Sequence, residues 1–235
     1  GYLCVQVCQT TTVCQTTTPD DEVIGGGGVL KKFSELGAHI TVVIATGGET
    51  GISENYNNIN DISTVRGAES QSSASILGVD ELLLWNNKTQ ELTNNKGLLH
   101  DVIKVIRKIK PDLVLTHSHD DKHRDHKCLS LVTCEGVWKA WENILPSLGE
   151  RHRVREIWAF EVVDPFSYPD IIVDITNYLQ YKIDAMEVHN SQHDVLGGSN
   201  EICNYITGLA MVRGYLNGCK YGEAFKICNI LPRSI

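Results

Sequence analysis

Two clusters of ionisable side chains have the residue types and spacing for metal binding or acid–base chemistry. In "TTTPDDEVIGGGG" (16–28), the adjacent carboxylates Asp20 and Asp21 lie between a proline and a run of four glycines. In "THSHDDKHRDH" (116–126), four histidines are interspersed with three aspartates. Imidazole and carboxylate groups together are the usual ligands of zinc and similar divalent ions. The two clusters therefore predict a metal site or an acid–base site.

Each cluster also has an explanation that involves no ligand. Acidic residues in the first turn of a helix interact favourably with the helix dipole, so "DDE" at 20–22 could serve the helix alone. Residues 116–126 could form a solvated loop that opens a helix, with Asp125 as its N-cap. Four histidines in one such loop are unusual, which favours metal binding or acid–base function.

The glycine run at 25–28 needs a compensating interaction. Glycine lowers helix stability by about 1 kcal/mol relative to alanine at each position. Close packing of the helix against a sheet, or close approach of a ligand, would compensate for this loss. A nucleotide site is disfavoured, because the run fits neither G-x-G-x-x-G nor a Walker motif.

Short apolar runs alternate with longer amphipathic ones along the chain. Strands are expected at 13–18, 39–46, 81–85 and 112–116, with helices at 22–36, 61–77 and 98–109. Further on, a helix over 125–143, a strand over 154–163, helices near 174–188 and 201–217, and a strand over 224–228 are expected. This alternation predicts an α/β fold with a mainly parallel sheet flanked by helices. No Pro/Gly/Ser-rich linker divides the chain, so we expect one domain over 1–235.

Three polar segments follow three of the expected strands. They are "TPDDE" (18–22), "TGGETG" (46–51) and "THSHDDKHRDH" (116–126). In parallel α/β sheets, ligands bind outside the carboxyl ends of the strands. We therefore expect the functional site on this edge of the sheet.

The composition argues against several classes of partner. The formal net charge of −8 disfavours nucleic acid and anionic membrane surfaces, because both would repel the chain. No apolar run approaches the ~20 residues that a membrane-spanning helix needs. The start, "GYLCVQVCQ", lacks the pattern of a signal peptide. The eight cysteines include no C-x-x-C pair, so we expect reduced cysteines and a cytoplasmic protein.

The motifs resemble those of a known enzyme family. "PDDEVIGGGG", "THSHDDKHRDH" and "HNSQH" (189–193), in this order, resemble the LmbE/PIG-L family of zinc-dependent N-acetylglucosamine deacetylases. "TGGETG", "RGAES" (66–70) and "YGEAF" (221–225) are similar to further family segments, so the resemblance covers nearly the whole chain. It implies a single Rossmann-like domain that hydrolyses the acetamido group of a small amino-sugar substrate. It also implies Zn²⁺ or another divalent metal, and leaves open a homo-oligomer.

The resemblance assigns roles to particular residues. Asp21 and His126 match metal ligands, and Asp20 matches the general base that deprotonates the attacking water. His123 matches the imidazole that stabilises the oxyanion or protonates the leaving amine, with Asp125 as its orienting partner. These roles are chemically coherent, since a metal ion acidifies water and polarises an amide carbonyl beside a carboxylate base. Outside this group, the resemblance implies that Glu49 and Arg66 contact the substrate.

The chain departs from the family at Thr18, where the family has its third metal ligand, a histidine. Catalytic zinc commonly has three protein ligands and a water molecule, and a threonine hydroxyl is a weak ligand. One alternative is therefore a metal-deficient or non-catalytic sugar-binding member of the family, and another is a hydratase of the same fold. His119, where the family has proline, could instead supply a replacement imidazole.

A different metallohydrolase is a further alternative. "HSHDDKH" (117–123) resembles the H-x-H-x-D-H motif of metallo-β-lactamase-like enzymes, which also follows a strand. However, Lys122 takes the place of the final histidine of that motif. That fold would also leave "PDDEVIGGGG" unexplained.

Overall fold

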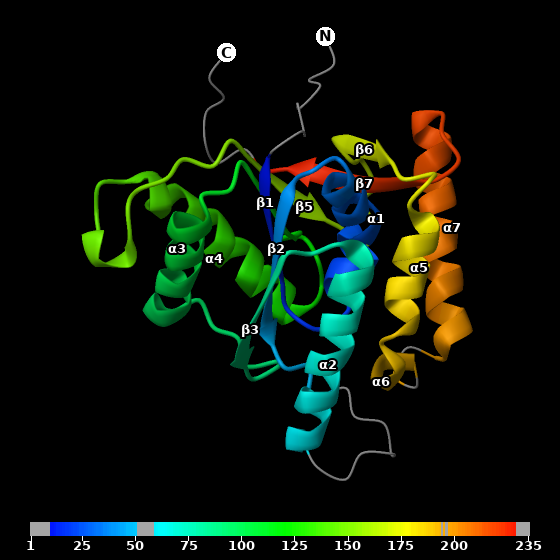
Figure 1. Cartoon of the computed structure of the whole chain (residues 1–235), viewed down its shortest axis with the longest axis horizontal. Helices are drawn as coiled ribbons and strands as arrows, with labels where there is room; N and C mark the ends of the chain where they lie inside the picture. The colour runs from blue at the N-terminus through cyan, green and yellow to red at the C-terminus, as the bar shows by residue number, and fades with distance from the viewer. Residues whose placement is uncertain (1–9, 51–58, 194, 196, 229–235) are drawn as a thin grey trace.

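A mixed sheet of seven strands forms the centre of the protein (Figure 1). The computed structural model describes residues 10–50, 59–193, 195 and 197–228. The strands are β1 (Thr11–Thr16), β2 (His39–Thr46), β3 (Glu81–Asn87), β4 (Leu113–His117), β5 (Glu156–Phe160), β6 (Ile171–Asp174) and β7 (Gly222–Ile227). They are arranged in the order β3-β2-β1-β4-β5-β7-β6. β1 to β5 pair in parallel and β7 runs antiparallel to β5 and β6, which confirms the expected mainly parallel sheet.

Helices cover both faces of the sheet. They are α1 (Asp21–Glu35), α2 (Ile59–Leu77), α3 (Lys96–Ile109), α4 (Arg124–Trp141), α5 (Leu179–Glu187), α6 (Asn190–His193) and α7 (Ser199–Asn217), with a short 3₁₀ helix η1 (Pro146–Leu148). Figure 1 shows α3 and α4 on one face, and α1, α2, α5 and α7 on the other. Among the described residues, no helix combines the length and apolarity needed to cross a membrane.

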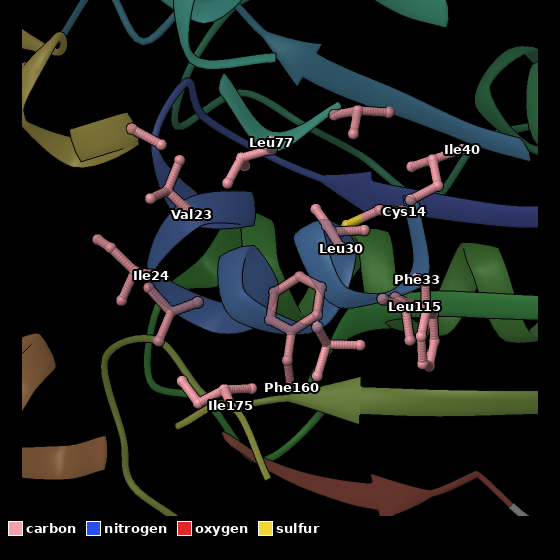
Figure 2. Close-up of a cluster of buried hydrophobic side chains, with 14 of the residues drawn as sticks. Cys14, Val23, Ile24, Leu30, Phe33, Ile40, Leu77, Leu115, Phe160 and Ile175 are labelled. Atoms are coloured by element: carbon pink, nitrogen blue, oxygen red, sulfur yellow. The ribbon is translucent and has the colours of Figure 1, made fainter. Parts of the chain in front are cut away.

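Each face of the sheet has its own hydrophobic core. In the core of Figure 2, Leu30 and Phe33 of α1 pack with Leu115 of β4 and Phe160 of β5. The opposite core contains Val13 of β1 among buried side chains of α3 and α4. Apolar burial on both faces fixes β1 and β4 in the middle of the sheet, because removing such side chains from water stabilises the packed arrangement. The polar segments that follow these two strands are thereby held in place.

The glycine run of α1 is explained by close packing. A Cβ atom on Gly25 would lie 2.3 Å from Cδ2 of Phe160, and one on Gly28 would lie 2.9 Å from Cδ1 of Ile175. Both distances are shorter than real Cβ contacts, so only glycine lets the helix approach these side chains. The expected close packing of the helix on the sheet is thus present at Gly25, and Gly28 packs equally closely on the turn after β6.

A buried ion pair lies beside the same glycines. The Glu223 carboxylate of β7 accepts hydrogen bonds from the backbone N–H groups of Gly28 (2.8 Å) and Val29 (2.7 Å). The Lys182 ammonium group of α5 donates to the Ile24 carbonyl (2.8 Å) and to Glu223 Oε1 (2.6 Å). Both side chains are buried, so each charge depends on the other and on the α1 backbone for its partners. The pair thus connects α5, β7 and α1 through hydrogen bonds.

The structure differs from the sequence expectations in the second half of the chain. Residues 171–174 form β6, and α5 begins at Leu179, so the helix expected from about 174 is wrong at its start. Asp174 Oδ1 accepts a hydrogen bond from Thr176 N (2.8 Å), which forms a local turn between strand and helix. A short apolar run such as 171–173 fits either structure by periodicity alone.

Candidate active site

The site lies between β1 and β4, where the order of successive strands along the sheet reverses. β1 and β4 are neighbours, yet the helices that follow them, α1 and α4, pack on opposite faces. Such a switch point leaves a crevice outside the carboxyl ends of the two strands. Residues 17–21 follow β1 directly, and His117 is the last residue of β4. The topology therefore brings the two ionisable clusters together.

Asp21 is buried at the start of α1, next to the carboxyl end of β1. Its Oδ2 atom accepts hydrogen bonds from Thr17 Oγ1 (2.8 Å), Thr18 N (2.8 Å) and Thr18 Oγ1 (2.6 Å). Burial alone would raise the pKa of Asp21, but His126, His117 and the Thr18 hydrogen bond hold it well below its usual range. The side chain is therefore a buried carboxylate in its charged form.

His126 lies against Asp21 and is oriented by a second carboxylate. Its Nε2 atom lies 3.5 Å from Asp21 Oδ2, and its Nδ1 atom lies 3.2 Å from Asp121 Oδ2 as an ion-pair contact. Burial would lower the pKa of His126, but Asp21 and Asp121 raise it to about 10. A carboxylate behind the outer nitrogen is the usual arrangement of a metal-binding histidine, because it keeps the proton on that nitrogen. Asp121 was not assigned a role from the sequence.

His117 completes a group of three potential ligands. Its ring stacks on His126, with centroids 3.8 Å apart and planes at 21°, and its Nε2 atom lies 3.6 Å from Asp21 Oδ2. One ligand atom from each of Asp21, His117 and His126 lies within 4.8 Å of the other two. From the sequence, His117 was placed in the histidine cluster but was assigned no role. His119, the candidate replacement ligand, lies instead on the surface with 62% of its side chain exposed.

Asp20 has an unusual backbone conformation next to this group. Its φ of 109° falls where L-residues rarely occur, and its carbonyl accepts the N–H groups of Val23 and Ile24 at the start of α1. Burial, together with the charges of Asp21 and Glu22, raises the pKa of the Asp20 carboxyl well above its usual value. A carboxylate whose pKa moves towards neutrality is better matched to proton transfer.

His123 and Asp125 lie at the start of α4. The His123 ring is 4.4 Å from that of His126 between centroids, and its Nδ1 atom accepts a hydrogen bond from the Asp125 backbone N–H (3.3 Å). His123 is thus the N-cap of α4, where Asp125 had been considered. The Oδ2 atom of Asp125 accepts a hydrogen bond from Gln90 N (2.6 Å), and its Oδ1 atom is buried without a hydrogen-bond partner. In this structure the contact of Asp125 with His123 is therefore made by its backbone N–H and not by its carboxylate.

Glu49 lies beside a broad cleft near the carboxyl ends of β2 and β3. Its carboxylate accepts hydrogen bonds from Thr89 N (2.7 Å) and Thr89 Oγ1 (2.8 Å). The cleft has a volume of about 900 Å³, and Glu49, Ser63, Asn87 and Thr89 are among its lining residues. These polar groups can hydrogen-bond a hydrophilic ligand.

Arg66 is held within the protein rather than in this cleft. It is 1% exposed and donates hydrogen bonds to the Gly48 carbonyl and to Ser191 Oγ. Ser191 in turn donates to Glu69 through its backbone N–H (2.8 Å) and its hydroxyl (2.6 Å). The "RGAES" and "HNSQH" segments are therefore joined by hydrogen bonds. This contact was not predicted from the sequence, where the two segments lie far apart.

The "HNSQH" segment also reaches the turn that carries Asp20. Gln192 Nε2 donates a hydrogen bond to the carbonyl of Pro19 (3.3 Å). His189 is fully buried, neither ring nitrogen has a hydrogen-bond partner, and burial and Arg66 lower its pKa to about 4. The segment is thus hydrogen-bonded to the Asp20 turn through Gln192, and it carries a buried, neutral imidazole at His189.

A match to a family model identifies the family to which the chain belongs. The model described as "PIG-L: GlcNAc-PI de-N-acetylase" matches residues 18–136, half of the chain, and this span contains both ionisable clusters. The chain belongs to the PIG-L family. The family resemblance expected from the motifs is confirmed.

Relatives of this PIG-L family member are deacetylases. Diacetylchitobiose deacetylase of Thermococcus kodakarensis is 26% identical over 224 residues, which cover 91% of this chain and 81% of that protein. The structure of N,N′-diacetylchitobiose deacetylase from Pyrococcus horikoshii, complexed with its inhibitor MPG, matches with a TM-score of 0.83 at 27% identity, covering 94% of this chain and 84% of that one. GalB, the 4-carboxy-2-hydroxymuconate hydratase from Pseudomonas putida, has the same fold, with a TM-score of 0.82, 20% identity, and coverage of 97% and 98%. The expected Rossmann-like architecture is thereby confirmed.

The Asp121–His126 contact leads to a first prediction for this PIG-L chain. Zinc added to Asp121→Asn is expected to bind about 10–100-fold more weakly than to the wild type, because the carboxylate would orient His126 and raise the basicity of Nε2 as a ligand. Isothermal titration with zinc measures the change. Asp120→Asn is the matched control, since Asp120 is adjacent but 62% exposed. Equal affinities for the two variants would show that His126 is held without Asp121.

Proposed function

We propose that this chain is a metal-dependent de-N-acetylase that hydrolyses the acetamido group of an N-acetylated amino-sugar conjugate. The observation that carries the proposal is the buried Asp21–His126 pair, with Asp121 behind the histidine and Asp20 beside the carboxylate. The named activities of the PIG-L relatives support the same reaction.

The residues present fit a divalent metal ion, for which zinc is our proposal. Asp21 offers a buried carboxylate oxygen and His126 offers Nε2, the nitrogen opposite its carboxylate contact. This mixture of oxygen and nitrogen donors suits zinc. When bound, the ion supplies a Lewis acid that polarises the acetamide carbonyl and acidifies the attacking water.

Proton transfers are assigned to Asp20 and His123. Asp20 takes a proton from the attacking water, because it is a buried carboxylate of raised pKa next to Asp21. His123 Nδ1 accepts a backbone N–H, so the proton of the neutral ring lies on Nε2. From Nε2, His123 can donate to the developing oxyanion or to the leaving amine.

Substrate binding is assigned to the cleft that Glu49 lines. Its volume of about 900 Å³ is sufficient for a sugar with an attached group, and its polar lining suits hydroxyl-bearing ligands. Arg66 acts on the substrate side only indirectly in this proposal. It fixes the loop at Gly48, next to Glu49.

Metal analysis combined with an acetate assay tests the proposal. The purified protein is expected to contain zinc and to release acetate from N-acetylglucosamine conjugates such as N,N′-diacetylchitobiose. Removal of the metal with a chelator should abolish acetate release, and added Zn²⁺ should restore it. Protein that binds no metal and releases no acetate after metal addition would refute the proposal. Hydration of a small unsaturated acid without acetate release would favour the hydratase alternative.

We place the enzyme in the cytoplasm as part of the same proposal. The described cysteines, which are free thiols, are Cys14, Cys128, Cys134, Cys203, Cys219 and Cys228. Reduced cysteines are typical of proteins that function in a reducing compartment.

A further inference from the structure

Thr18 is already engaged in a way that makes it a poor metal ligand. Its hydroxyl donates to Asp21 Oδ2 (2.6 Å), and its backbone N–H donates to the same oxygen (2.8 Å). The neutral hydroxyl thus stabilises the charge of Asp21 as a hydrogen-bond donor. A zinc site with only Asp21 and His126 would lack the third protein ligand that catalytic zinc commonly has.

His117 reaches the same point from the neighbouring strand. It is fully buried at the end of β4, and its Nε2 atom lies 3.6 Å from the oxygen of Asp21 that also faces His126. The three ligand atoms lie within 4.8 Å of one another, and binding one ion would require the stacked His117 and His126 rings to turn towards it. We propose that His117 Nε2 is the third metal ligand of this enzyme, in place of the residue at position 18. The inference rests on the proposed metal-dependent function.

The hydrogen bonds of His117 prepare the ring for this role. Its Nε2 atom accepts the backbone N–H of Thr17 (3.0 Å), so the proton of the neutral ring lies on Nδ1. A ligand that binds through Nε2 must be in this tautomer. Metal binding exchanges the Thr17 N–H for the ion as the partner of the Nε2 lone pair.

Cobalt binding to four proteins distinguishes His117 from Thr18 as the ligand. The proteins are the wild type, His117→Gln, Thr18→Val and the double variant His117→Gln/Thr18→His. The glutamine amide oxygen can still accept the Thr17 N–H but is a much weaker ligand than imidazole. Titration calorimetry gives the affinity for Co²⁺, and the visible d–d absorption of the complex reports its ligands independently of turnover.

The expected results separate the candidates. The wild type and Thr18→Val should bind one Co²⁺ with similar spectra. His117→Gln should bind about a hundredfold more weakly with altered absorption, because one of three protein ligands is lost. Adding Thr18→His to His117→Gln should restore most of the affinity, since it supplies an imidazole at the alternative position.

Other results would refute His117 as a ligand without refuting the proposed function, and one result would refute the proposed function itself. Wild-type affinity in His117→Gln would show that His117 only anchors Thr17. A change in the d–d absorption of the Co²⁺ complex in Thr18→Val would identify Thr18 as a ligand, because loss of its hydrogen bond to Asp21 changes the affinity and not the set of ligands. This decides the question even where the His117 variant fails to fold. A wild type that binds neither Co²⁺ nor Zn²⁺ would refute the metal-dependent function itself.

Discussion

The Asp20→Asn variant is expected to keep its metal and to lose about 10²–10⁴-fold in kcat for acetate release. Asparagine has nearly the shape of aspartate but cannot accept the proton of the attacking water. Asp20 is buried beside Asp21, and no other carboxylate is proposed for this step. Asparagine also tolerates positive φ comparatively well, so the turn should persist. Steady-state kinetics with parallel metal analysis measures the effect.

The control for Asp20→Asn is the same chemical change at an exposed site. Asp101 of α3 is half exposed and pairs with Lys104 three residues away, so Asp101→Asn should retain kcat. If Asp20→Asn retained kcat with full metal occupancy, another group would have to remove the proton. If it lost its metal, Asp20 would contribute to the metal site and the kinetic result would not report on the base.

The second large effect is expected for Lys182→Met. This substitution should lower the free energy of unfolding by about 3–5 kcal/mol, because it leaves the buried Glu223 carboxylate without its counter-charge. The Ile24 carbonyl also loses the hydrogen bond from Lys182. Equilibrium unfolding in urea, followed by tryptophan fluorescence, gives the free energy of each variant.

Two comparisons test the cause of that loss. Lys104→Met removes an exposed ion pair and should change the free energy of unfolding by at most about 1 kcal/mol. Lys182→Met/Glu223→Gln should recover part of the lost stability, because the unpaired charge is removed as well. Equal losses in Lys182→Met and Lys104→Met would show that burial does not strengthen the Lys182–Glu223 pair.

The sheet was predictable where local pattern and topology agree. The buried strands β1, β2 and β4 are short apolar or β-branched runs, and the helices between them end at glycine or before proline, which are strong local signals. β6 was missed because its pairing with β7 connects residues about fifty positions apart, such as Ile171 and Phe225. Such pairing stabilises a strand whose own sequence does not distinguish it from a helix.

The site was predictable only to the level of its motifs. Asp21 and His126 could be paired because a family resemblance connects their segments. The position of His117 against Asp21 depends on the registration of β1 and β4, where Cys14 lies beside Leu115. The contact between Asp121 and His126 depends on the path of the loop before α4. Both are three-dimensional facts that residue type and spacing do not encode.

The left-handed backbone at Asp20 has a consequence for how this enzyme can change. A non-glycine residue at a φ of 109° carries a conformational cost of the order of 1–3 kcal/mol, which glycine would largely avoid. The substitution that relaxes this turn would thus also remove the proposed base. With Asp20 as the base, stability and turnover would oppose each other at position 20, and laboratory evolution for heat resistance alone would tend to replace this residue.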